Sequence, residues 1–211
     1  MKLYKKIIAW AILSIILQIG GLFVLDNFVF KHSSKFKSNK IDIEKQNTKD
    51  INVIIPNGAE NVNISYNGKY LTYYEKDTLY IEESKTGTKT EVKTEDNGEI
   101  LYYKWLSDRD RLIIAEKVVK DGETVIQLIT YSPKDSSVSY VTSICDYEDD
   151  MKVMKITEST FTSVYYVDIY RGGLKSMVYR IDINNDKSRV SLQASVLGNM
   201  QVIPHVDRLV Y

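Results

Sequence analysis

Hydrophobic and polar positions divide the chain into three parts. Ile7 to Leu25 is a run of 19 residues in which only Ser14 and Gln18 are notably polar. Residues 31–50 are polar and rich in lysine, with no sustained apolar period. From Ile51 onward, short stretches rich in Val, Ile, Tyr and Thr alternate with turn-forming residues, as in β-structure. The pattern predicts an apolar helix, a polar stalk and an all-β domain.

The apolar run is long enough to cross a membrane. As a helix it extends about 28 Å, close to the hydrocarbon thickness of a bilayer. It is longer than the core of a typical secretory signal, and Leu25 to Phe30 contains no small-x-small cleavage site. We therefore expect residues 1–30 to be an uncleaved anchor with a basic amino terminus, held in the membrane through Ile7 to Leu25. Residues 31–50 are expected to form a solvated stalk.

The β-region, residues 51–211, contains repeated sets of four short strands separated by turns such as Asn67-Gly68. The predicted strands are residues 62–66, 69–75, 78–83 and 88–92, then 99–106, 111–117, 123–131 and 136–141, then 152–156, 160–169, 175–183 and 188–192. A partial set begins at residues 200–203 and continues at Arg208. The four units are therefore placed at about residues 59–92, 99–141, 152–192 and 200–211.

The second strands of these units share a sequence pattern. Gly68 to Tyr73 corresponds to Asp110 to Ala115, and Asp207 to Tyr211 follows the same pattern. The first step is about 42 residues, and two further steps together span about 97. Four-stranded units at 40–50-residue intervals are typical of propeller blades. Such blades stack because one sheet cannot bury both of its faces alone.

These motifs resemble a known repeat. Ser65-Tyr66-Asn67-Gly68-Lys69, followed by Leu79-Tyr80-Ile81 and Thr86-Gly87, is similar to the repeat of TolB-type propellers and of the amino-terminal propeller of dipeptidyl peptidase IV. Tyr66 and Asn67 stand where the repeat usually has proline and aspartate. Trp105-Leu106-Ser107-Asp108 opens the second unit in a similar way. The resemblance covers about residues 61–211 and implies about three to four four-stranded antiparallel blades.

The resemblance also bears on topology. Lysines flank the apolar run almost equally on its two sides, so the positive charge alone does not orient it. The resemblance implies a single-pass membrane protein with an extracytoplasmic carboxyl-terminal domain.

The β-region suffices for about three and a third blades, whereas closed propellers have at least four. We expect the sequence to be part of a longer protein, and an open arc with an exposed β-edge is the alternative. Pairing of Ile51 to Ile55 with a late strand is one way in which such an array could close.

Composition argues against several function classes. Lys+Arg and Asp+Glu both number 28, so the formal net charge is zero, which argues against nucleic-acid binding through bulk charge. Cys145 is the single cysteine and cannot form an internal disulfide. Together with only two histidines, His32 and His205, it argues against a zinc site built from His and Cys.

The sequence carries no catalytic motif. It has no Gly-x-Ser-x-Gly nucleophile elbow and neither of the glycine-rich phosphate-binding patterns. His32 falls in the predicted stalk and His205 in a predicted turn. We therefore predict no catalytic, cofactor-binding or metal-binding residues and no cofactor.

Two further features have alternative interpretations. The acidic loop Asp146 to Asp150, beside Cys145, could offer oxygen ligands to calcium, but it lacks the spacing and the glycine of a calcium loop. A solvated connection between units is favoured. For the strand aromatics, packing between sheets is favoured over a carbohydrate or peptide platform. These aromatics are Tyr70, Tyr73, Tyr74, Tyr80, Tyr102, Tyr103, Trp105, Tyr165, Tyr166 and Tyr179.

Together these inferences favour a membrane-anchored, extracytoplasmic, non-catalytic binding or scaffolding module with propeller-like blades. Its partner would be an envelope protein, peptide or glycan, and not a nucleic acid. The alternative is the propeller portion of a larger hydrolase similar to dipeptidyl peptidase IV, whose catalytic domain is absent from this sequence. A transmembrane signalling regulator ranks third, because only Met1 to Lys6 would lie in the cytoplasm.

Overall fold

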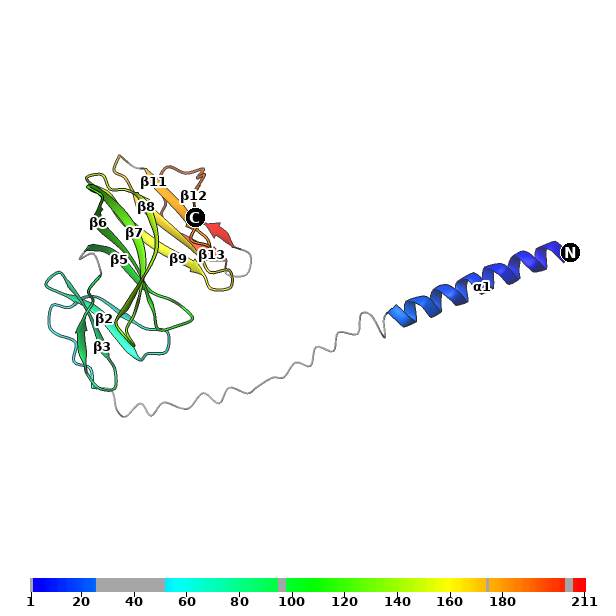
Figure 1. Cartoon of the computed structure of the whole chain (residues 1–211), viewed down its shortest axis with the longest axis horizontal. Helices are drawn as coiled ribbons and strands as arrows, with labels where there is room; N and C mark the ends of the chain where they lie inside the picture. Colours follow the sequence, from blue (N-terminus) through cyan, green and yellow to red (C-terminus); the bar gives the residue numbers. More distant parts are fainter. Residues whose placement is uncertain (1, 26–51, 95–97, 174, 204–206) are drawn as a thin grey trace. The chain divides into compact units, whose positions relative to one another are not determined.

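The computed structural model describes residues 2–25, 52–94, 98–173, 175–203 and 207–211. The chain divides into two compact units, Met1–Gln46 and Asn47–Tyr211, which are described separately. The described residues form one apolar helix, three four-stranded antiparallel sheets and one two-stranded sheet (Figure 1). The predicted all-β class with four-stranded units is confirmed. The predicted stalk, His32 and His205 lie outside the described residues.

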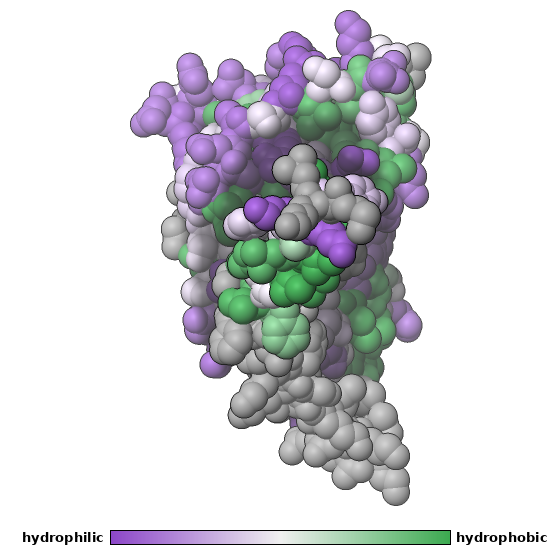
Figure 2. All heavy atoms as spheres, turned by 90° about the vertical axis from the view of Figure 1, so that its right-hand side faces the viewer, coloured by the Kyte–Doolittle hydropathy of each residue, from purple (hydrophilic) through white to green (hydrophobic). Residues whose placement is uncertain are grey.

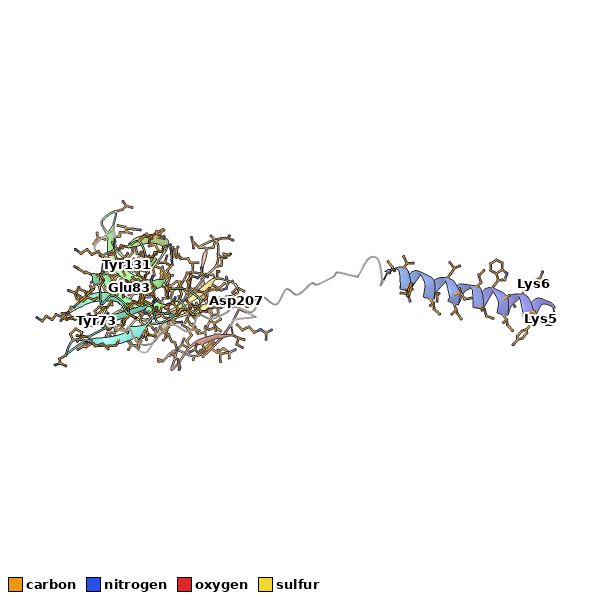
Figure 3. All side chains as sticks on the ribbon, turned by 90° about the horizontal axis from the view of Figure 1, so that it is seen from below. Lys5, Lys6, Tyr73, Glu83, Tyr131 and Asp207 are labelled. Carbon is orange, nitrogen blue, oxygen red and sulfur yellow. The ribbon has the colours of Figure 1, made fainter. Side chains whose placement is uncertain are left out.

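Helix α1 spans Lys2–Val24. Its segment Tyr4–Val24 is long and apolar enough to cross a membrane, although an amino-terminal signal sequence meets the same criterion. Figure 2 shows hydrophobic side chains on the helix and hydrophilic ones at its amino-terminal end, where Figure 3 places Lys5 and Lys6. An apolar helix is therefore present, and its retention as an anchor stays a prediction.

Each four-stranded sheet is a meander in which consecutive strands pair as neighbours. The first sheet comprises β1 (Glu60–Ile64), β2 (Tyr70–Glu75), β3 (Thr78–Glu83) and β4 (Lys89–Glu91). The second comprises β5 (Glu99–Trp105), β6 (Leu112–Lys120), β7 (Glu123–Ser132) and β8 (Ser137–Asp146). The third comprises β9 (Lys152–Ser159), β10 (Val164–Tyr170), β11 (Ser176–Ile181) and β12 (Lys187–Val190), and β13 (Gln201–Ile203) pairs with β14 (Arg208–Val210).

Most strands lie where the alternation of residue types predicts them, with two corrections. β8 continues to Asp146 instead of ending at residue 141, because it pairs with β7 over its whole length and two register shifts obscure its alternation. The strand predicted for residues 160–169 begins only at Val164, since the preceding residues form a turn in which Ser163 has a φ of 52°.

The sheets stack in sequence order and enclose three apolar clusters. Strand β6 shows the arrangement most clearly. Leu112 and Ile114 belong to the cluster shared with the first sheet, whereas Ile113 and Ala115 belong to the cluster shared with the third sheet. All four side chains are 0% exposed. The second sheet is therefore covered on both faces, which accounts for its continuous apolar run.

The first strands of successive sheets contact one another: β1 contacts β5, β5 contacts β9, and β9 contacts β13. Each of β1, β5 and β9 is also an edge strand of its own sheet. The inner edges of the three large sheets therefore lie next to one another, and β4, β8 and β12 form the outer edges. This order corresponds to propeller blades arranged about an axis.

Polar side chains join neighbouring sheets near the turns of the repeat. The indole Nε1 of Trp105 donates to Thr72 Oγ1 over 3.0 Å, and Asn67 Nδ2 donates to Asp110 Oδ2 over 2.6 Å. Between the third and the two-stranded sheet, Arg180 Nη2 donates to Asp207 Oδ2 over 2.8 Å. The repeated motifs identified in the sequence therefore supply contacts between sheets.

The amino-terminal end of the β-domain docks on the first sheet. The amide N–H of Asn52 donates to the Ser84 carbonyl, and its Nδ2 donates to the Lys85 carbonyl, each over 3.0 Å. Residues 52–55 form no strand. The suggested pairing of residues 51–55 with a late strand is therefore wrong for residues 52–55, because Asn52 is held at the β3–β4 connection.

Gly87 permits this docking. Its φ is +67°, and a Cβ atom there would lie 2.8 Å from the Asn52 carbonyl oxygen. We expect Gly87→Ala to lower the free energy of unfolding by about 2 kcal/mol or more, from left-handed strain plus the clash. The control Gly122→Ala has a φ of +86° but open space, so it should cost only about 1 kcal/mol. Urea unfolding of the detergent-solubilised chain measures both, and equal losses would contradict the docking of Asn52.

Candidate binding groove

A groove of about 640 Å³ lies on the β-domain between the first and second sheets. This volume falls within the range of small-molecule and side-chain binding pockets. The groove lies where the β2–β3 turn, the end of β4 and the start of β5 converge. Its lining residues are Gly58, Glu60, Asn61, Tyr74, Lys76, Asp77, Thr78, Leu79, Glu91, Val92, Gly98, Glu99, Ile100 and Leu101.

Tyr74 lines the wall of the groove and packs against Tyr103. The rings of Tyr74 and Tyr103 meet edge to face, with centroids 5.6 Å apart and planes at 62°. Burial, with a smaller contribution from Tyr103, raises the pKa of Tyr74 to about 12. The Tyr103 hydroxyl donates to the Asn61 carbonyl, and burial also raises its pKa. Both phenols are therefore neutral at physiological pH and add no charge to the wall.

Carboxylates dominate the charge of the groove. Glu60, Asp77, Glu91 and Glu99 line it, and Lys76 is the one basic residue among the lining residues described above. Lys93 lies 3.5 Å from Glu91, and Lys117 lies 3.3 Å from Glu99, both in solvent-accessible ion pairs. Exposed pairs of this kind cost little to exchange for another partner. The groove therefore suits a ligand that carries positive charge or several hydrogen-bond donors.

A buried carboxylate lies behind this wall. Glu116 is 1% exposed, and its Oε1 accepts a hydrogen bond of 2.6 Å from Gln127 Nε2. A Cβ atom on Gly98 would lie 2.7 Å from Glu116 Oε2 and 2.9 Å from the Lys117 carbonyl oxygen. Gly98 therefore lets the start of β5 approach β6 closely and sets the shape of this side of the groove.

The acidic loop between the second and third sheets is tied down by an ion pair. Arg171 Nε donates to Glu148 Oε2 over 2.7 Å, and its Nη2 donates to Glu148 Oε1. In the described part of the chain, no group of three or more His, Cys, Asp and Glu side chains could hold a metal ion. Cys145 is half-buried, and burial raises the pKa of its thiol. The interpretation of this loop as a solvated connection between units stays a prediction.

The aromatic residues singled out in the sequence mostly pack between or within sheets. Tyr70 stacks on Trp105, with centroids 6.2 Å apart and planes at 12°. Tyr73 is 1% exposed and its hydroxyl donates to Glu82 Oε2 over 3.0 Å. Tyr103 and Tyr166 are also buried. The packing interpretation therefore describes these residues, and Tyr74 alone among the ten lines the groove.

Sequence reasoning did not identify the groove. Its carboxylates are dispersed from Glu60 to Glu99 and each lies at a turn or a strand end, where a charged residue is normally interpreted as solvated. The order and direction of the strands in the meander explain how these carboxylates come together. Because antiparallel neighbours alternate in direction, the β2–β3 turn, the end of β4 and the starts of β1 and β5 must fall at the same end of the sheets.

Comparisons with known proteins show a distant structural similarity only. No protein-family description matches the sequence, and no curated protein matches it. Among solved structures, the tricorn protease matches with a TM-score of 0.41 and 12% identity, covering 59% of this chain and 14% of that chain. The WD40 domain of SCAP from fission yeast matches with a TM-score of 0.35 and 12% identity, covering 66% and 35%. A putative TolB from Agrobacterium tumefaciens matches with a TM-score of 0.29 and 13% identity, covering 64% and 62%.

The chain thus spans less than two thirds of each of these proteins. The class that the sheets define is a propeller-like β domain, preceded in this chain by an apolar helix. No sequence family is shown for it.

The raised pKa of Tyr74 predicts a contribution to alkaline sensitivity. Between pH 10, where an unfolded tyrosine ionises, and about pH 12, the unfolded state loses this proton before the folded state does. Stability is therefore retained below pH 10 and lost as the pH rises towards 12. Two pKa units correspond to about 2.7 kcal/mol, and partial solvent exposure reduces this to about 1–2 kcal/mol.

Tyr74→Phe should remove the part of the alkaline loss of stability that comes from ionisation of Tyr74. The measurement is urea unfolding of both proteins at pH 9 and pH 11.5, with the spectral titration of tyrosinate as a second readout. If the two proteins lose stability equally over this interval, Tyr74 is not held neutral by the groove wall.

Proposed function

We propose that the chain is a membrane-anchored, extracytoplasmic binding or scaffolding module without catalytic activity. The observation that carries this proposal is the groove of about 640 Å³ between the first two sheets. Its rim is formed by turns and strand ends on closely packed sheets, an arrangement in which a rigid scaffold presents variable binding residues.

The lining of the groove is polar and acidic. The described lining residues offer carboxylates, the Tyr74 hydroxyl and Thr78, and they contain no serine–histidine or cysteine–histidine pair of the kind that the proposed absence of peptidase activity concerns. A carboxylate-rich surface beside an aromatic wall instead favours cationic groups. Of the expected partner classes, a protein or peptide with lysine or arginine side chains therefore fits better than a neutral glycan.

The apolar helix supports the proposed anchoring of the domain to a membrane. Tyr4–Val24 has the length and composition of a membrane span. A binding domain tethered to a membrane meets membrane-associated partners at high effective concentration, so that a modest affinity suffices. The proposed location of the domain outside the cytoplasm rests on the TolB-like motifs of the sequence.

A photo-crosslinking amino acid at Thr78, in the groove, tests binding in the source cells. We expect it to capture one discrete partner, and the same probe at Ser139, an exposed position on β8, should not. Glu91→Lys combined with Glu99→Lys should reduce capture at least fivefold, because both carboxylates line the groove. Glu123→Lys combined with Asp149→Lys, at two exposed carboxylates outside the groove, is the charge-matched control. Capture of the same partner from Ser139, or an equal reduction by this control pair, would contradict the groove as the binding site.

The absence of catalysis is tested on the purified full chain. We expect no hydrolysis of peptide or ester p-nitroanilide and p-nitrophenyl substrates above buffer, and no labelling by a fluorophosphonate. The control is a known serine hydrolase in the same detergent. Turnover that co-elutes with the chain in gel filtration would overturn this part of the proposal.

A further inference from the structure

Strand β1 is the inner edge of the first sheet; β5 contacts it, but in the described part of the chain no strand pairs with it opposite β2. All five of its residues are exposed, and it pairs with β2 on one side only. Asn63 Nδ2 donates to the Tyr103 hydroxyl over 3.2 Å, so Asn63 faces the second sheet. Because side chains alternate along a strand, Val62 and Ile64 face the opposite side, where they are 43% and 64% exposed.

The backbone of β1 has pairing capacity at Ile64. The Ser65 N–H donates to the Tyr70 carbonyl over 2.9 Å, and Asn63 pairs with Thr72 in register. Residues bonded to a neighbouring strand alternate with residues whose backbone groups point the other way. Ile64 lies between the two bonded positions, so its N–H and C=O point away from β2.

Two of the outer edges, β4 and β8, are in contrast protected. β4 is three residues long and carries Lys89 and Glu91. On the β8 edge, Lys187 Nζ donates to the carbonyl oxygens of Ser143 and Ile144, each over 2.9 Å. Short strands and lysines are the usual means by which proteins prevent unwanted strand pairing. The stretch Val62 to Ile64 carries no charge, and among the described residues no lysine lies on its backbone; the Tyr103 hydroxyl donates to the carbonyl of Asn61, just before it.

We infer that β1 is the docking edge for an extended polypeptide segment of the partner, which adds to the first sheet as a further strand. This inference rests on the proposed function and specifies its partner class, because only a polypeptide backbone offers alternating N–H and C=O groups that match such an edge. Alternate apolar side chains of the segment pack on Val62 and Ile64. Glu60 and Asn61 of β1 also line the groove, so the segment continues into it and places basic side chains beside the carboxylates.

The test uses the full chain in lipid nanodiscs and a fluorescein-labelled peptide, Lys-Thr-Val-Thr-Val-Thr-Val-Lys. A matched peptide carries N-methyl groups on its four central residues, which blocks strand pairing along both of its edges. Fluorescence anisotropy should show saturable binding of the first peptide and at least tenfold weaker binding of the second. Equal binding of the two peptides would overturn the inference.

Substitutions on β1 test whether the peptide binds at this edge. Ile64→Lys and Val62→Lys should each weaken binding at least fivefold, and near-ultraviolet circular dichroism checks that both variants fold. Val119→Lys is the matched control, because Val119 is 68% exposed but lies in the β6–β7 hairpin, outside β1 and outside the groove lining. It should change the affinity less than twofold. An equal loss in Val119→Lys, or self-association of the chain that Ile64→Lys abolishes, would overturn docking of a partner segment here.

The outcomes separate this inference from the proposed function. If neither peptide binds while the probe at Thr78 still captures its partner, the inference about β1 is wrong and the binding function stands. If the capture at Thr78 also fails, the proposed function itself is wrong.

Discussion

The structure depends on the covering of both faces of the second sheet. A twisted four-stranded sheet made of Val, Ile and Leu on both faces is unstable alone, and burial of each such side chain contributes about 1.5–3 kcal/mol. In β6, Leu112 to Ala115 alternate between two clusters and all four are fully buried. The first and third sheets are therefore required by the sequence of the second, and the groove and the inner edges follow from how these sheets stack.

Buried carboxylates fix how the sheets are placed against one another. Glu158 of β9 is 8% exposed, and its Oε1 accepts a hydrogen bond of 2.7 Å from the Ser107 amide of the β5–β6 turn and another from the Ser107 hydroxyl. A buried charge is costly unless it is hydrogen-bonded, so this pairing tolerates little sliding of the third sheet along the second. Apolar clusters supply most of the stability, whereas contacts of this type specify the relative position of the sheets.

The sequence predicts the strands well and the site poorly, for a physical reason. Strand alternation and turn residues such as Asn67-Gly68 depend on neighbours along the chain, and so does the repeat of four strands. The docking of Asn52 on Ser84 is a backbone contact across 32 positions that leaves no periodic trace in the sequence. The groove is similar, since its carboxylates are each ordinary turn residues, and only the pairing of the meander brings them to one end. Its Tyr74 was identified, but as a packing residue.

The acidic groove and the exposed residues of β1 both result from the way in which the sheets stack. Stacking buries the middle of each sheet, and it leaves the strand ends and the side chains of β1 exposed. Outer edges can be capped by lysines, as Lys187 caps β8, without affecting the stack. Charges of that kind on β1 would lie close to the carboxylates of the groove and compete for them. Val62 and Ile64 of β1 are exposed beside an acidic groove, and in our proposal both features act on one ligand, the edge on the ligand's backbone and the groove on its basic side chains.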